Sequence, residues 1–160
     1  MNIIRYELGT EQELLDKIRQ VRLKGTINGV ERPYVYQHAQ LRLVEKMRVD
    51  PFLVPPQRYV LTPTVDAILD LHRTFEKLGV DIFALHGALY FWLSGSDPEK
   101  DPPIPLLPPM VEESDEPDGR TVFLINDGMH RTFSARKIGS PFHVVLALDV
   151  PTEYPFFALV

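Results

Sequence analysis

The first 25 residues carry a helical pattern of apolar and polar positions. Apolar residues between 14 and 21 fall on one helical face, and Thr10 and Glu13 have the spacing of a capping box. This pattern predicts an amphipathic helix over 10–24 that Gly25 ends.

Strand-like stretches follow, separated by turn residues. Asn28-Gly29 predicts a hairpin turn between Thr26-Ile27 and Val30. Strands are expected at 3–6, 34–36 and 40–49, and prolines hold 53–60 extended.

Helical patterns return in the middle of the chain. Thr62 and Pro63 have the order of a cap followed by a first helical residue, which predicts a helix over 63–78 with Gly79 as its stop. A second helix is predicted over 81–93. It is apolar on most sides, so it is expected to be buried or to cover a partner surface.

The final third mixes prolines, acidic residues and strands. The proline-rich stretch 97–109 excludes helix, so we expect an extended connection ending in an edge strand near 106–111. The acidic residues between 112 and 118 predict a solvated hairpin tip. The remaining predicted elements are strands at 121–125 and 143–148, a helix at 129–138 ended by Gly139, and an apolar end, 151–160, that packs on the body.

These elements predict an α+β fold, in which a small mixed sheet carries packed helices. A length of 160 residues suits a single domain over 1–160, and 44% hydrophobic with 24% charged residues is ordinary for a globular protein. The chain has no apolar run near the roughly 20 residues that span a bilayer, no signal-peptide pattern at its start and no cysteine. We therefore expect a cytoplasmic protein without membrane contact.

The net charge and the spacing of histidine and acidic residues argue against two kinds of site. The net charge of −5 argues against a generally basic nucleic-acid-binding surface, which makes a nucleic-acid partner unlikely on sequence grounds. Histidine and acidic residues do not cluster at metal-ligand spacing, so no dedicated metal site is expected.

The chemistry-bearing stretch is 126–131. An apolar strand runs into Asp127 and Gly128, which break it, and a helix-compatible segment follows. The free amides and the dipole at the start of such a helix favour an anion. His130 and Arg131 add side-chain donors, and the planar fork of arginine suits phosphate. The stretch therefore predicts a phosphate pocket, which requires Arg131 to lie beside the turn.

Several residues of this stretch also have possible structural roles that need no ligand. Asp127 as a simple helix cap is worth about 1 kcal/mol and needs no ligand. His130 as a satisfied polar residue is as plausible as a ligand contact. The hydroxyls of Thr132 and Ser134 usually bond their own backbone in a helix.

The segment from Leu106 to Val150 resembles the ParB/sulfiredoxin superfamily. The resemblance rests on Asp127-Gly128-Met129-His130-Arg131, on Ala135 and Gly139 in the helix, and on the strand after it. A family-like core of about 40–150 is expected, with 1–39 as an N-terminal extension.

The resemblance implies that the turn binds the phosphates of ATP or CTP, with Mg²⁺ bridging them. The implied binding residues are Asn126, Asp127, Gly128, Met129, His130, Arg131 and Thr132. Asp127 would orient Arg131, hold a metal or cap the helix. Candidate catalytic residues are Asp127, His130 and Glu45, the last because it lies near the first family-like strand.

Two departures from the family pattern reduce the number of activities that the resemblance implies. Met129 stands where sulfiredoxin chemistry needs cysteine, and the absence of cysteine excludes that activity. A complete partition protein is not expected, because no helix-turn-helix domain follows the last strand. The small-molecule kinases of the superfamily share the Asp-Gly-x-His-Arg form and are the closer comparison.

Three hypotheses remain at this point. The first is a nucleotide-binding phosphotransferase or NTPase. The second is a non-enzymatic interaction module with a vestigial phosphate pocket, whose helix over 81–93 meets a protein partner or a second copy. The third, a nucleic-acid-processing protein, is disfavoured by the acidic charge.

Overall fold

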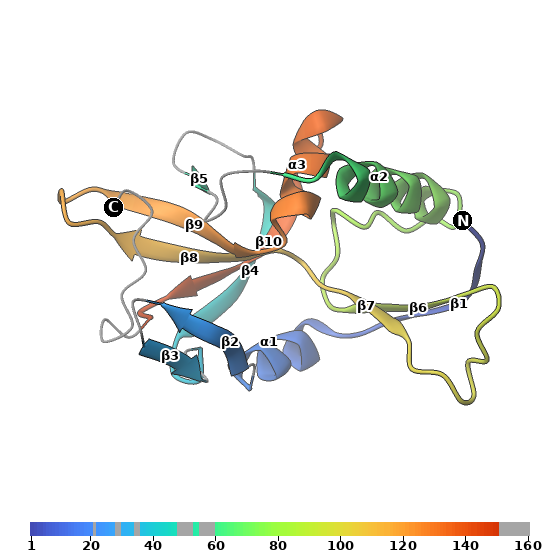
Figure 1. The fold of residues 1–160 in the computed structure, drawn as a ribbon, viewed down its shortest axis with the longest axis horizontal. Coiled ribbons are helices and arrows are strands. Elements are labelled where there is room, and N and C mark those ends of the chain that lie inside the picture. The colour runs from blue at the N-terminus through green and yellow to red at the C-terminus, as the bar shows by residue number, and fades with distance from the viewer. Residues whose placement is uncertain (21, 28–29, 34–35, 48–52, 55–59, 151–160) are drawn as a thin grey trace.

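The computed structural model describes residues 1–20, 22–27, 30–33, 36–47, 53–54 and 60–150 (Figure 1). Within these residues the chain forms helices and three β-sheets, which confirms the α+β class. The helices are α1 (Glu11–Arg19), α2 (Thr62–Glu76) and α3 (Met129–Lys137). No helix in the described ranges combines the length and apolar character needed to cross a bilayer.

The largest sheet is mixed and has the strand order β4-β10-β8-β9-β5. Its β10 pairs antiparallel with β4 and parallel with β8, while β9 pairs antiparallel with β8 and parallel with β5. The strands are β4 (Gln40–Met47), β5 (Leu53–Val54), β8 (Met110–Asp115), β9 (Thr121–Asp127) and β10 (Phe142–Leu148).

Two smaller sheets complete the fold. A three-stranded antiparallel sheet has the order β1-β6-β7, with β1 (Ile3–Leu8), β6 (Leu89–Leu93) and β7 (Ile104–Leu106). The hairpin of β2 (Arg22–Ile27) and β3 (Val30–Pro33) flanks the sequence at which the turn was predicted.

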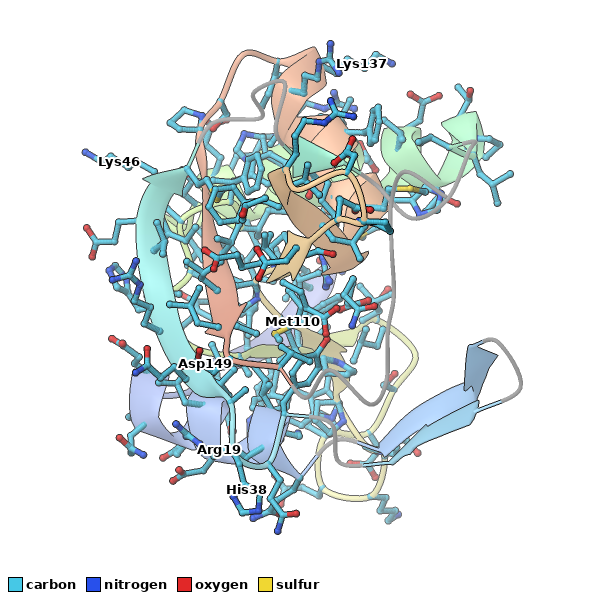
Figure 2. The ribbon with its side chains drawn as sticks, turned by 90° about the vertical axis from the view of Figure 1, so that its left-hand side faces the viewer. Arg19, His38, Lys46, Met110, Lys137 and Asp149 are labelled. Atoms are coloured by element: carbon cyan, nitrogen blue, oxygen red, sulfur yellow. The ribbon has the colours of Figure 1, made fainter. Side chains whose placement is uncertain are left out.

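The core has two layers because side chains alternate across β10. Val144 and Leu146 pack into a cluster with residues of α2 and α3, whereas Val145 and Ala147 pack with residues of α1. Figure 1 shows α2 and α3 on one side of the large sheet and α1 on the other. In Figure 2, Met110 lies inside the molecule, and Lys137 lies at its periphery on α3.

Helix α1 begins as predicted and ends early. Its capping box is present, with the Thr10 hydroxyl accepting from the Glu13 amide at 3.2 Å. The predicted end at Gly25 is wrong, because 22–27 forms strand β2 and pairs with β3. Strand pairing supplies hydrogen bonds that outweigh the local helical pattern there.

Helix α2 confirms the helix predicted over 63–78, but Thr62 is not its cap. Thr62 is already the first helical residue, Pro63 follows it, and Leu61 occupies the N-cap position without a side-chain hydrogen bond. Proline in the first turn costs nothing, since the amide it lacks has no partner inside the helix.

The helix predicted over 81–93 is wrong. Residues 82–87 form turns and β6 follows, lying between β1 and β7. Helical spacing cannot distinguish a buried helix from a buried strand when apolar residues occupy most positions. Gly87 also packs against the N-terminal segment, where an added Cβ would lie 2.3 Å from the Gly9 carbonyl oxygen.

The edge strand predicted near 106–111 is confirmed at its start only. β7 lies at the edge of its sheet and ends at Leu106, whereas β8 begins at Met110 and lies between β10 and β9 in the large sheet. The Pro109 carbonyl just before β8 accepts from the Val145 amide of β10 at 2.9 Å. The acidic stretch is not wholly a solvated tip, since Glu112 in β8 is 3% exposed and Glu116 is 4% exposed.

Some predictions concern residues that lie partly or wholly outside the described part of the chain. Tyr36 lies in a turn and is buried, so it is not in a strand, while residues 34–35 lie outside the described part of the chain. The predicted packing of 151–160 also lies outside it, as do 48–52 and 55–59.

Candidate functional site

The predicted phosphate turn is built by β9, a single glycine and α3. β9 runs through the large sheet as far as Asp127, and α3 begins at Met129. Gly128 between them has a φ of +86°, in the left-handed region that glycine enters without strain. Gly128 is the N-cap, so the interpretation of Asp127 as the cap is wrong. The helix therefore starts without a side-chain cap on its amides.

Gly128 is also required by space. A Cβ at this position would lie 2.7 Å from Nη2 of Arg131 and 2.8 Å from Cβ of Pro109. Real Cβ atoms do not approach other atoms this closely, so any side chain would displace Arg131 or the backbone before β8. The glycine lets a guanidinium lie directly against the turn.

Arg131 lies beside the turn, as the phosphate hypothesis requires. Its Nη2 donates to Oδ2 of Asp127 at 2.8 Å, and its side chain is 16% exposed while that of Asp127 is 64% exposed. The Nε of Arg131 is buried and has no hydrogen-bond partner. An unpaired buried donor carries a desolvation cost of about 1–3 kcal/mol, more when charged, so this guanidinium has unused capacity for an acceptor.

The other side chains of 126–132 point elsewhere. Asn126 donates to the hydroxyl of Tyr36, and Met129 is buried in the core. The buried Thr132 hydroxyl donates to the Gly128 carbonyl at 3.0 Å, which is the plainer role foreseen for it. Asp127, Gly128 and Arg131 are thus the residues that face the turn together.

His130 joins α3 to the start of α2. Its Nε2 accepts a hydrogen bond from the Leu61 amide at 3.1 Å. An accepting Nε2 places the proton of the neutral ring on Nδ1. His130 therefore positions the two helix starts, and it does not direct Nε2–H at the turn.

Glu45 lies apart from the turn. It is on β4, which β10 and β8 separate from β9, so about 14 Å of sheet divides it from Asp127. Its Oε1 lies 2.9 Å from Nε2 of His86, and this hydrogen bond, then the charge of His86, lowers the pKa of Glu45.

The ring of His143 lies 4.9 Å from that of His86, so Glu45 and two histidines gather at one place that the sequence spacing did not indicate. Within the described ranges, no group of three or more histidine and acidic side chains has the arrangement to hold a metal ion.

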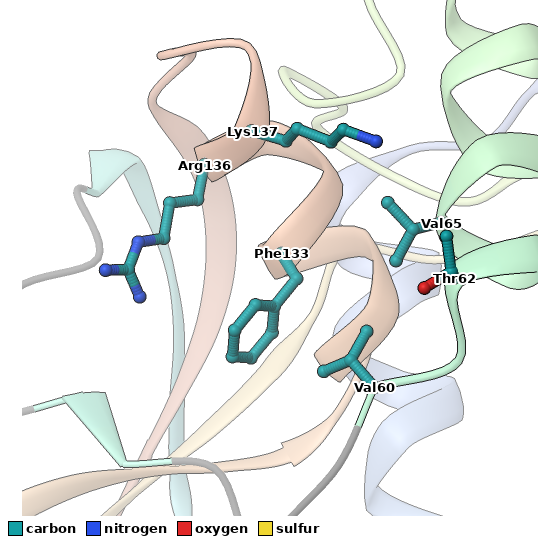
Figure 3. A pocket seen from close by; sticks show the side chains of 6 residues that line it. All are labelled: Val60, Thr62, Val65, Phe133, Arg136 and Lys137. Carbon is teal, nitrogen blue, oxygen red and sulfur yellow. The ribbon is translucent and has the colours of Figure 1, made fainter.

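A separate cleft of about 420 Å³ lies between the start of α2 and the outer face of α3 (Figure 3). It is lined by Val60, Thr62, Val65, Phe133, Arg136 and Lys137. None of the predicted site residues lines it. The sequence does not predict this cleft because its walls come from segments about 70 residues apart. Only Arg136 and Lys137 are adjacent to each other in the sequence.

Comparison with known proteins yields one family. The family model described as the ParB CE domain matches residues 13–160, a range that includes the whole of β9, the turn and α3. No curated protein matches the chain.

Proposed function

The chain belongs to the ParB CE domain family, and from this premise we propose that it binds the phosphates of a nucleotide, ATP or CTP with Mg²⁺, at the turn between β9 and α3. Family membership confirms the resemblance to ParB-like proteins. The nucleotide, the metal and any reaction are the proposal.

The observation that carries the proposal is the state of Arg131. Its guanidinium lies over Gly128, is mostly buried, and keeps Nε without a hydrogen-bond partner. A purely structural ion pair with Asp127 leaves that donor unexplained. A phosphate over Gly128 would give the guanidinium an acceptor, because guanidinium and phosphate form paired charge-assisted hydrogen bonds; Nε would take part only if the side chain shifts towards the ligand.

The start of α3 supports the same occupant. The N-cap is a glycine without a side-chain hydrogen bond to the helix amides. The first amides of a helix have no partner inside it, and together with the helix dipole they attract an anion. A phosphate at this position would be held by these amides and by Arg131.

The residues at the turn also fit a phosphate-bound Mg²⁺. Asp127 is exposed and offers a carboxylate beside the proposed phosphate position. Mg²⁺ on a nucleotide needs few protein carboxylates, because water and phosphate oxygens supply most of its ligands. When bound, the ion would neutralise part of the phosphate charge.

We extend the proposal to a phosphotransferase or NTPase activity. Phosphoryl transfer depends mainly on positioning and charge neutralisation, which the amides and Arg131 provide. Asp127 is the candidate acid–base residue at the turn. Glu45 is too distant and His130 is engaged with Leu61, so the proposal gives neither of them a role in the reaction.

The interaction-module hypothesis loses its main support. Its partner surface was the helix expected over 81–93, and the chain forms the inner strand β6 there, with Leu89 fully buried. A homo-oligomer or protein partner remains a prediction without a surface assigned to it.

The test is isothermal titration calorimetry with ATP and with CTP, each with Mg²⁺. We expect Arg131→Ala to weaken binding about 10- to 100-fold, the range for a charged hydrogen-bonding partner. The matched control is Arg73→Ala, because Arg73 also pairs with an aspartate of its own helix, Asp70, at 3.3 Å. Phosphate release over time tests the NTPase activity.

Absence of binding by the unmodified protein at millimolar nucleotide would refute the proposal. So would equal affinities for Arg131→Ala and Arg73→Ala. Binding without phosphate release would leave a nucleotide-binding protein and remove the NTPase activity from the proposal.

A further inference from the structure

We propose that the cleft between α2 and α3 is a second ligand site, for a small organic anion with a flat apolar body. The body would lie against Phe133 and the valines that line the cleft, and the anionic head would meet Arg136, which Figure 3 shows on the side of Phe133 away from Val65. This site is separate from the nucleotide turn.

Helix geometry separates the two sites. Successive residues of an α-helix project about 100° apart, so Phe133 lies about 200° around α3 from Arg131. Arg131 turns towards Asp127 at the start of the helix, while Phe133, Arg136 and Lys137 line the cleft. Arg131 and Arg136 project about 140° apart on the same geometry.

The walls of the cleft suit an apolar body. Val65 is buried on the α2 side, and Val60 and Phe133 are half-buried and pack against the core cluster. Phe133 presents an aromatic ring towards Val60, on which a planar group can stack (Figure 3). A volume of about 420 Å³ lies within the usual range of small-molecule sites, about 300–1,000 Å³.

The cleft carries two cationic side chains, Arg136 and Lys137, which favour an anionic ligand. They differ in whether their charge is already paired. Nζ of Lys137 lies 3.2 Å from Oδ1 of Asp66, so its charge is already paired. Arg136 is exposed, and its side chain has no ion pair or hydrogen-bond partner among the described residues. Figure 3 shows the two side chains leaving α3 in opposite directions. Arg136, whose fork suits carboxylate, phosphate or sulfonate, is therefore the specificity-determining residue.

The remaining features of the cleft concern the placement of its polar groups. Arg136 and Lys137 stand in the last turn of α3, where the helix dipole favours cationic side chains. The hydroxyl-bearing Thr62 is the polar residue of the opposite wall. The chemical class that fits is an aryl or alkyl carboxylate, phosphate or sulfonate.

The test uses an aromatic sulfonate probe, 1-anilinonaphthalene-8-sulfonate, in a fluorescence titration of the folded protein. We expect saturable binding to one site, weakened about three- to tenfold by Arg136→Gln, as for loss of one charge-assisted contact. Lys137→Gln is expected to have a smaller effect. Arg73→Gln, which removes an exposed arginine from α2, is the matched control and is expected to have none.

Further measurements test separately the contributions of the ligand's apolar body and of its anionic head. Phe133→Leu keeps the core filled and removes the flat ring, so we expect weaker probe binding with an unchanged circular dichroism spectrum. The neutral analogue N-phenyl-1-naphthylamine is expected to bind with an affinity that Arg136→Gln does not alter. Inorganic phosphate alone, lacking the apolar body, is expected not to displace the sulfonate.

Unsaturable fluorescence, or Arg136→Gln behaving like Arg73→Gln, would overturn the proposal. Displacement of the probe by ATP together with its loss in Arg131→Ala would also overturn it, because both would mean a single shared site. Probe binding that survives Arg131→Ala supports the second site even when no nucleotide binds, so the two proposals fail independently.

Discussion

Nε2 of His130 accepts a hydrogen bond from the backbone amide of Leu61 at 3.1 Å, across 69 residues of sequence. The contact fixes the first turn of α3, which follows the candidate anion turn, to the N-cap of α2. The same connection sets the near end of the cleft, since Val60 and Thr62 on either side of Leu61 line it. One imidazole thus positions both candidate sites.

We expect His130→Ala to lower the free energy of unfolding by about 0.5–1.5 kcal/mol, the usual net value of such a hydrogen bond. Urea unfolding would measure the change. His38→Ala, which replaces an exposed histidine in a turn, is the control and is expected to leave stability unchanged within about 0.5 kcal/mol. Equal stability of the two variants would mean that water satisfies the Leu61 amide as well as His130 does.

Asp127→Asn is expected to change nucleotide affinity in opposite directions with and without Mg²⁺. Without the metal, loss of the carboxylate frees Arg131 and removes repulsion, so affinity should rise about three- to tenfold. With Mg²⁺, the variant lacks a group placed to approach the ion, so the gain should shrink or reverse. Calorimetric titrations with ATP in EDTA and in Mg²⁺ would measure both. A change of the same sign and size under both conditions would contradict a metal role for Asp127.

Gly128→Ala is expected to destabilise the chain by about 2 kcal/mol or more. The residue adopts φ +86°, and an added Cβ would lie within 3 Å of both Arg131 and Pro109. Gly139→Ala is the matched control, because Gly139 has φ +68° with no other group within 4 Å, so it should cost only the left-handed strain of about 1–2 kcal/mol. Thermal or urea unfolding would compare them. Equal losses would show that the close approach of Arg131 adds nothing.

The pKa of the Glu45 carboxyl is expected to lie below its ordinary value of 4.5, first because His86 donates a hydrogen bond to it and then because the charge of His86 favours the carboxylate. A lowered pKa means that the folded chain binds this proton less tightly than the unfolded chain. The resulting stabilisation is present above the unfolded-state pKa of Glu45 and is lost as the pH falls through its folded value.

An NMR titration of the Glu45 side-chain carboxyl would measure the effect. His86→Ala should raise the titration midpoint towards the ordinary value, whereas His38→Ala should leave it in place. An unchanged midpoint in His86→Ala would assign the shift to some other neighbour.

The sequence predicted the elements whose signals are local. The strand, turn and helix around Gly128 were recognised from neighbouring residues, and so were the capping box at Thr10 and the stop at Gly139. The ion pair of Asp127 and Arg131 corresponds to one of the three roles that the family resemblance implied for Asp127, that of orienting Arg131.

Features made by distant segments could not be predicted in this way. β6 was read as helix because its partners, Leu8 and Leu106, lie far away in sequence, and burial on both faces removed the alternation that marks a strand. The pairing of Glu45 with His86 and the cleft wall formed by Val60 and Phe133 likewise exist only after folding. Asp127 was misassigned as a cap because a glycine with positive φ takes that position.

The pairing of β1 with β6 has a consequence for biosynthesis. Leu8 finds its partner Leu89 only after about 80 further residues have been made, which takes several seconds at about 5–20 residues per second. During that interval the nascent chain carries an unpaired strand with Ile4 and Leu8 available to other surfaces. Strand β1 is therefore open to pairing with wrong partners until β6 has been made.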